Sequence, residues 1–188
     1  MRRRNSSLLL LIVVLIVVVA LFYFRGSPPT GNNPGSVTPT ATSSEAHLGV
    51  QTKTSGCMAH SSLPDSACTP GAIIATATKD VICKSGYAQS VRNVPDSEKN
   101  QVYAEYSIVK HSSGQYEVDH LVSLELGGSN DIANLWPELA SPKPGFHEKD
   151  KVENYLHSQV CSGAISLHDA QIEIATNWLA VYNGMPSK

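Results

Sequence analysis

An unbroken run of about 17 apolar residues, Leu8–Phe24, separates a short basic N-terminus from the rest of this chain. As a helix, the run would span roughly 26 Å, close to the thickness of the hydrocarbon core of a bilayer. Three arginines precede it, and only Arg25 follows it closely. Because basic residues favour the cytoplasmic side, we expect a cytoplasmic N-terminus and export of the remaining chain.

The apolar run has two interpretations, an uncleaved anchor and a cleaved signal peptide. A signal peptide usually has a shorter apolar stretch and ends at a site of small residues. No such site stands between Ala20 and Pro28, which favours the anchor. We therefore predict a single-pass protein of the cell membrane, with residues 1–25 as its membrane segment. Cleavage would instead give a secreted protein with the same exported domain.

The composition changes after the apolar run. Residues 26–55 are rich in Pro, Gly, Ser, Thr and Asn and hold almost no large apolar side chain. Such a segment cannot bury a core and is typical of a flexible stalk. The folded, extracytoplasmic domain is then expected over residues 56–188.

Secondary-structure patterns in the exported domain predict a small α+β fold. The predicted helices are Ser97–Tyr106, with Ser97 as its N-cap, Glu148–Cys161, and one from Leu167 that Ser166 caps with Asp169. Residues Tyr116–Leu126 alternate at roughly period two, which predicts a strand or hairpin arm. The predicted order is strand, loop, short strand, helix and packing helix.

The charge of the exported part argues against one class of function. All 16 acidic residues lie after residue 25, against 10 of the 14 basic ones, which gives a net charge near −6. Binding of nucleic acid by bulk electrostatics is therefore not expected. A metal ion or a local basic patch would have to compensate, and Lys143, Lys149 and Lys151 are the candidates for such a patch.

Four cysteines follow the anchor, and none of them forms a C-x-x-C pair. This spacing is poor for zinc, and an exported compartment favours disulfides. Three connectivities are open. We favour a local Cys57–Cys68 bridge and a long-range Cys83–Cys161 bridge.

The most informative stretch is YEVDHLVSLELGGSNDIANLWPE, residues 116–138. Its His120 can accept a proton at neutral pH, and Asp119 stands directly before it. Neighbours in a strand point to opposite faces, so the pair serves one site only where the strand ends or bends. The Gly127-Gly128 pair predicts a sharp turn soon afterwards.

Together with the following residues, this stretch resembles the HNH, or His-Me finger, endonucleases. The matching elements are Asp119-His120 at a strand end, Ser123–Gly128 as the turn, Asn134-Leu135 on the second strand, and His147 with Lys149 at the helix start. This core covers about 40 residues. Flanking segments resemble exported bacterial and phage proteins that carry the same finger. The resemblance implies a domain built on a ββα-metal finger with additional packing helices.

The resemblance also implies roles for single residues. His120 would be the general base that removes a proton from the attacking water. Asp119 and His147 would hold one divalent metal ion, Mg²⁺ or Mn²⁺, with Zn²⁺ as a third candidate. Asn134 would hold the loop and so orient His120, and Lys149 would meet a phosphate.

The helix start departs from the family pattern, because His147 stands two residues before Lys149 rather than three. Asp150 and Glu153 are alternative ligands on the same helix. The implied function is metal-dependent hydrolysis of phosphodiester bonds in DNA or RNA with little sequence specificity. The alternative is a membrane-anchored, non-catalytic binding module that keeps the finger as a scaffold. No protein partner is identifiable from the sequence.

Overall fold

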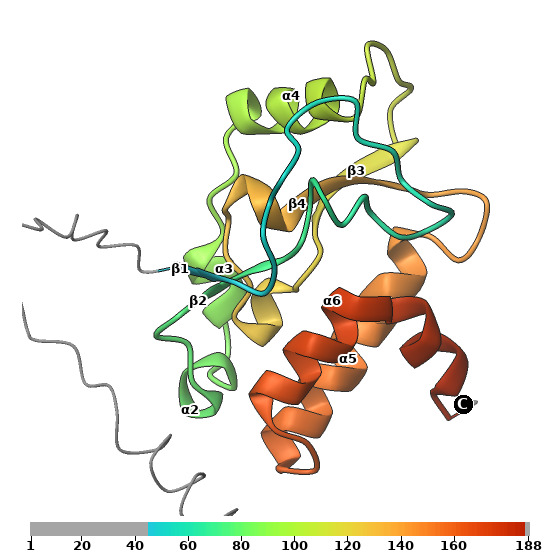
Figure 1. The fold of residues 1–188 in the computed structure, drawn as a ribbon. Coiled ribbons are helices and arrows are strands. Elements are labelled where there is room, and N and C mark those ends of the chain that lie inside the picture. The colour runs from blue at the N-terminus through green and yellow to red at the C-terminus, as the bar shows by residue number, and fades with distance from the viewer. Residues whose placement is uncertain (1–44, 187–188) are drawn as a thin grey trace, which may run out of the picture. The chain divides into compact units, whose positions relative to one another are not determined.

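The computed structural model describes residues 45–186, which form a small α+β domain (Figure 1). The predicted membrane segment, Leu8–Phe24, and most of the predicted stalk lie outside the described residues. Within residues 45–186, none of the helices has the length and apolar character needed to cross a bilayer.

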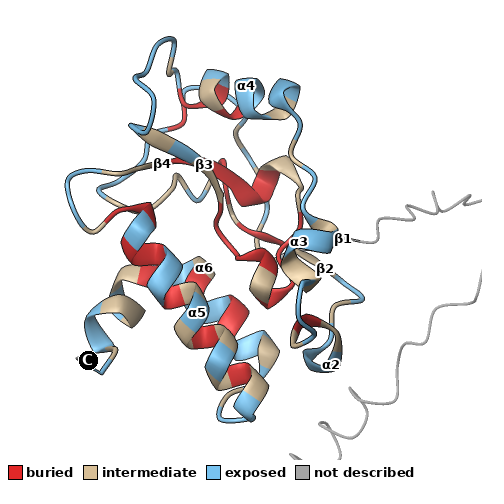
Figure 2. Ribbon diagram, turned by 180° about the vertical axis from the view of Figure 1, so that it is seen from behind, coloured by how far each residue is buried: buried red, intermediate tan, exposed pale blue. Residues whose placement is uncertain are grey.

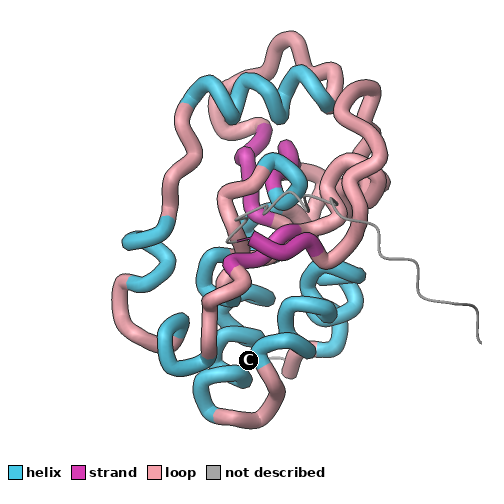
Figure 3. Tube along the Cα trace, turned by 60° about the vertical axis from the view of Figure 1, so that its left-hand side comes forward, coloured by secondary structure: helices cyan, strands magenta, loops and turns pink. Residues whose placement is uncertain are grey.

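The described elements follow one another with short connections. They are β1 (Glu45–His47), β2 (Ala72–Ile74), α2 (Lys79–Ile82), α3 (Tyr87–Val91), α4 (Asp96–Glu105), β3 (Tyr116–His120), the 3-10 turns η1 (Leu124–Leu126) and η2 (Ile132–Asn134), β4 (Leu135–Leu139), α5 (Phe146–Ser162) and α6 (Leu167–Gly184). The strands form two antiparallel pairs, β1–β2 and β3–β4. Helices and loops surround these pairs (Figure 3).

The antiparallel pair β3–β4, followed by α5, forms a ββα unit. His120 is opposite Leu135, and Asp119 is opposite Trp136. The predicted order of strand, loop, short strand, helix and packing helix is therefore confirmed. The predicted strand Tyr116–Leu126 is too long, because β3 ends at His120 and the following turn includes η1.

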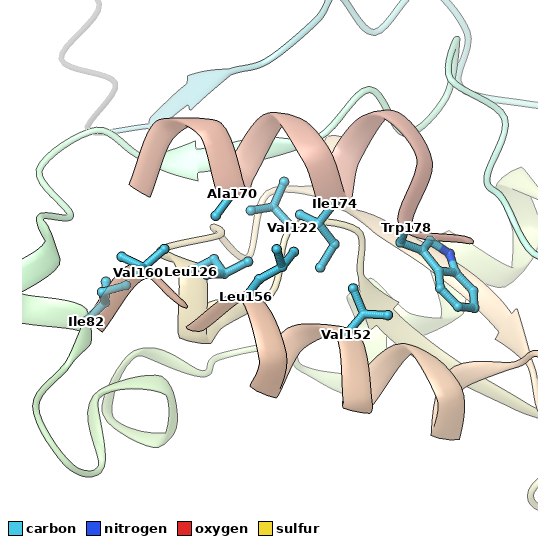
Figure 4. Close-up of a cluster of buried hydrophobic side chains, with 9 residues drawn as sticks. All are labelled: Ile82, Val122, Leu126, Val152, Leu156, Val160, Ala170, Ile174 and Trp178. Atoms are coloured by element: carbon cyan, nitrogen blue, oxygen red, sulfur yellow. The ribbon is translucent and has the colours of Figure 1, made fainter. Parts of the chain in front are cut away.

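Helices α5 and α6 lie side by side and enclose the main core (Figure 4). The buried side chains come from one face of each helix and from the loop after β3. They are Val152, Leu156 and Val160 on α5, Ala170, Ile174 and Trp178 on α6, and Val122 and Leu126 from the loop, and Ile82 at the end of α2 completes the cluster. This stripe of buried residues at helical spacing runs along both helices in Figure 2. The core therefore fixes α5 against the loop that follows His120.

The two predicted helix caps have different outcomes. Ser166 caps α6, because its hydroxyl accepts the backbone N–H of Asp169 at 3.0 Å. The Ser97 cap is wrong, since α4 begins at Asp96 and Pro95 is its N-cap. Proline fixes a suitable φ at the start of a helix, so the chain turns earlier than the serine suggests.

The folded domain also begins earlier than residue 56. Strand β1 pairs with β2, and the backbone N–H of Leu48 donates to the carbonyl of Gly71 at 2.9 Å. Thr52 donates in the same way to Ala67 at 2.9 Å. Backbone hydrogen bonds hold this segment in the fold. Because such bonds do not depend on the side chains, the polar composition of the segment did not predict them.

Both predicted disulfides are confirmed. Cys57 is bonded to Cys68, and Cys83 is bonded to Cys161. The second bridge has a sequence separation of 78 and joins the end of α2 to the last turns of α5. It therefore links the N-terminal half of the domain to the helix of the ββα unit.

Removal of this long bridge should destabilise the domain. We expect the double substitution Cys83→Ser, Cys161→Ser to lower the free energy of unfolding by about 2–4 kcal/mol, since a disulfide restricts the unfolded chain. Urea unfolding of the variant and of wild type, both without reductant, measures the loss. A loss below about 1 kcal/mol would contradict the prediction.

Candidate functional site

The loop after β3 turns sharply at Gly127 and Gly128. Gly127 has φ of +74°, which is the left-handed region. A Cβ atom on Gly128 would lie 1.8 Å from the carbonyl oxygen of Val122, so only glycine fits. This close turn brings the residues after it back toward the end of β3.

Asn134 holds this loop from within. Its side chain is fully buried, and its Oδ1 accepts the backbone N–H groups of Val122 at 2.9 Å and Ala72 at 3.3 Å. Its Nδ2 donates to the carbonyls of Val122 at 3.0 Å and Ser129 at 2.8 Å. The amide thus takes the hydrogen bonds that strand pairing would have used at Val122, which is why β3 ends at His120.

His120 is held in one orientation by Asn130. Its Nε2 lies 3.1 Å from Oδ1 of Asn130. The Asn130 amide is fixed independently, because its Nδ2 donates to Val91 O at 2.8 Å and its Oδ1 accepts from Asn93 N–H at 3.1 Å. An amide oxygen only accepts, so this network assigns the hydrogen to Nε2 and the lone pair to Nδ1.

The imidazole of His120 is neutral at pH 7. Burial lowers its pKa to about 4, although the charge of Asp119 acts in the opposite direction. In the described part of the chain, Nδ1 makes no hydrogen bond, and it is not among the unpartnered atoms that are sealed from solvent. A neutral, solvent-reaching Nδ1 is able to take a proton from water.

Lys149 lies at the centre of a buried charge cluster rather than at the surface. Its Nζ donates to Asp119 Oδ2 at 2.8 Å, to the carbonyl of His120 at 2.7 Å, and to Glu153 Oε1. The side chain is 0% exposed, so all three N–H groups are used inside the protein. The predicted contact of Lys149 with a phosphate is therefore wrong for this structure. Helix α5 turns this residue inward, toward β3.

The other members of the predicted basic patch are also paired. Lys143 lies 3.4 Å and Lys151 lies 3.3 Å from Oε1 of Glu148. With Lys149 buried, Lys143 and Lys151 remain at the surface and share one carboxylate, so the three lysines do not form one patch. The expectation of a local basic patch at the start of α5 is wrong.

Two more carboxyl groups complete the buried cluster around Lys149. Glu138 on β4 is fully buried, and its carboxyl group shares a side-chain hydrogen bond with Asp119. Burial raises the pKa of Glu138 to about 10, which keeps it protonated at neutral pH. Burial also raises the pKa of Glu153 to about 7, although Lys149 opposes this, and Glu153 Oε2 accepts the Ser123 hydroxyl at 2.8 Å.

Asp119 connects the buried cluster to the outer side of the site. Burial raises its pKa most, but the charge of Lys149, the hydrogen bonds to Glu138 and Lys149, and the charge of His120 together hold the pKa below its ordinary value. Its Oδ1 accepts the backbone N–H of His120 at 2.8 Å. Asp119 is therefore an ionised carboxylate. Its Oδ2 accepts from the ammonium of Lys149, and its Oδ1 accepts from the backbone of His120.

The remaining candidate metal ligands lie near the start of α5. His147 is exposed on the first turn of α5, near Asp150. Burial raises the pKa of Asp150 and the charge of Asp119 raises it further, while His147 lowers it. The pKa of Glu117 is also raised, most of all by burial and further by the charges of Asp119 and Asp150. These carboxylates leave a local excess of negative charge.

Asp119, His147 and Asp150 do not form a group of three ligand atoms within 4.8 Å of one another, so they do not make a closed metal site. Mg²⁺ is commonly held by one or two carboxylates, with water and phosphate oxygens as the other ligands. Within residues 45–186, the single group of three or more His, Cys, Asp or Glu ligand atoms within 4.8 Å of one another is Cys83, His157 and Cys161. Its two cysteines form a disulfide, so this group does not supply thiolates.

Sequence reasoning missed Asn130 and Glu138. Asn130 stands two residues after the glycine pair. Only its residue type and its closeness to the turn could have marked it as a site residue. Glu138 stands in the short strand β4 among apolar residues, where a charged residue type is unexpected. That mismatch could have marked it as part of a buried polar cluster.

In comparisons with family models, curated proteins and solved structures, nothing matched this chain.

Proposed function

We propose that this protein is a metal-dependent endonuclease that hydrolyses phosphodiester bonds of DNA or RNA with little sequence specificity. The observation that carries the proposal is the fixed imidazole of His120. It is neutral at pH 7, is held through Nε2 by Asn130, and has an Nδ1 that makes no hydrogen bond among residues 45–186. A purely structural histidine needs no such combination.

Each residue of the site has its own role in the proposed hydrolysis. Nδ1 of His120 accepts a proton from water as the water attacks phosphorus, while Asn130 keeps the other nitrogen protonated. Asn134 holds the loop that presents Asn130 to His120. Lys149 keeps Asp119 ionised.

Asp119 and His147 would hold the divalent ion, with Asp150 as a further carboxylate nearby. The chemistry that such an ion supplies is positive charge for the phosphate and for the leaving oxygen. This positive charge matters because the exported part has a net charge near −6, which repels a phosphate.

The proposal is tested with plasmid DNA and the purified full chain. We expect nicking with Mg²⁺ or Mn²⁺ and loss of nicking in EDTA. His147→Ala should raise the Mn²⁺ concentration needed for half-maximal activity, whereas His168→Ala, an exposed histidine on α6, should leave it unchanged. Failure to cut either DNA or RNA with several divalent ions would overturn the proposal.

The acidity of the exported part favours a second candidate, a non-catalytic binding module on the cell surface. This module would keep the ββα unit as a scaffold only. Calorimetry with Mn²⁺ separates the two, because a scaffold without a site should give the same result for wild type and His147→Ala.

A further inference from the structure

Besides a divalent ion, a side-chain cation would help to bind the phosphate of the substrate, and the lysines at the start of α5 are all engaged with carboxylates. Lys149 is buried among carboxylates, and Lys143 and Lys151 are paired with Glu148. A cation without such a carboxylate partner lies in another part of the chain.

Arg92 is the only arginine after Arg25. It follows α3 directly, is exposed, and makes no ion pair with any residue in the described range 45–186. A guanidinium offers five N–H donors in a planar fork that matches two phosphate oxygens. Arg92 is thus chemically suited to the phosphate and is not already engaged.

The backbone on both sides of Arg92 is attached to the residue that orients His120. The carbonyl of Val91 accepts from Asn130 Nδ2 at 2.8 Å, and the N–H of Asn93 donates to Asn130 Oδ1 at 3.1 Å. The same oxygen receives Nε2–H of His120 at 3.1 Å. One amide therefore holds the Arg92 segment and the His120 ring together.

The electrostatics agree with this placement. The positive charge of Arg92 acts on the pKa of His120, Glu117 and Asp150, in each case lowering it. In these three groups, burial is the larger influence. Arg92 is thus within electrostatic reach of both the histidine and the acidic side of the site.

We propose that Arg92 is the phosphate-binding residue of this site, and that Asn130 positions it together with His120. The ligand class is a phosphodiester in a nucleic acid backbone. The inference rests on the proposed nuclease function for its role in a reaction, although binding itself does not require cleavage.

Binding of a short fluorescein-labelled single-stranded DNA to the full chain tests the inference by fluorescence anisotropy in EDTA at low salt. We expect Arg92→Ala to raise the Kd about tenfold, and to reduce the slope of log K against log salt by about 0.7, the value for one phosphate contact on a single strand. Arg92→Lys should recover only part of the affinity, because lysine lacks the planar fork.

Lys84→Ala is the matched control, since it removes an exposed positive charge between α2 and α3. It should change the Kd less than about twofold, as expected when only long-range charge is lost. Wild-type affinity in Arg92→Ala, an equal loss in Lys84→Ala, or no binding by wild type would each overturn the inference.

Cleavage kinetics separate this inference from the proposed function. If wild type cuts DNA and Arg92→Ala keeps the same KM and kcat, the nuclease proposal stands and the Arg92 proposal falls. If DNA binds through Arg92 but is never cut with any divalent ion, the nuclease proposal falls and the binding site stands.

Discussion

Replacement of His120 by alanine should reduce the cleavage rate by about 10²- to 10⁴-fold, the usual contribution of a general base. The substitution removes the neutral imidazole whose Nδ1 makes no hydrogen bond among residues 45–186. Single-turnover cleavage of plasmid DNA measures the effect. His111→Ala is the control, because His111 is exposed and lies before β3. Equal rates for His120→Ala and wild type would show that another group takes the proton.

The pH dependence gives a second test of His120. Burial lowers its pKa to about 4, so the basic form should persist as the pH falls from 8 to about 5. An unperturbed histidine would instead lose activity through pH 6.5. The measurement is kcat/KM against pH at saturating Mn²⁺. A fall in activity centred near pH 6.5 would contradict the lowered pKa.

Replacement of Lys149 by methionine should cost about 3–5 kcal/mol in the free energy of unfolding, because one partner of a buried ion pair is removed. Asp119 and Glu153 would be left as buried carboxylates without their cation. Urea unfolding at pH 8 measures the loss. Lys143→Met, at a 75% exposed side chain before the same helix, should cost less than about 1 kcal/mol.

The loss caused by Lys149→Met should also depend on pH. In wild type, Lys149 lowers the pKa of both Asp119 and Glu153. Without it, the native pKa values rise above those of the unfolded chain, so the native state binds more protons and gains stability as the pH falls. The destabilisation at pH 8 should therefore exceed that at pH 5. A loss that is equal at both pH values would mean that lost packing, not charge, explains the effect.

The local part of this fold was predictable because it depends on neighbouring residues. The apolar spacing of α5 and α6 places their buried faces, and Ser166 signals the start of α6. The glycine pair marks a turn that the φ of Gly127 and the tight space at Gly128 explain. The two disulfides match the favoured one of the three connectivities that the sequence left open.

The length of β3 was not predictable from its alternation. Residues 121–126 continue the pattern, yet the Asn134 amide satisfies the backbone of Val122 and a 3-10 turn follows. A side chain distant in sequence competes here with strand pairing. Periodicity describes what a segment can form and does not include this competition.

The sequence by itself determined the order of the ββα unit and placed Asp119 and His120 at a strand end. Only the tertiary structure decided what their neighbours do. The register between α5 and β3 turns Lys149 inward onto Asp119, and the packing of the α3 segment brings Asn130 to His120 and leaves Arg92 exposed. The physical reason is the direction of each side chain. Successive side chains on a helix point about 100° apart around the helix axis, so the packing of the elements decides whether a cation faces a carboxylate or solvent.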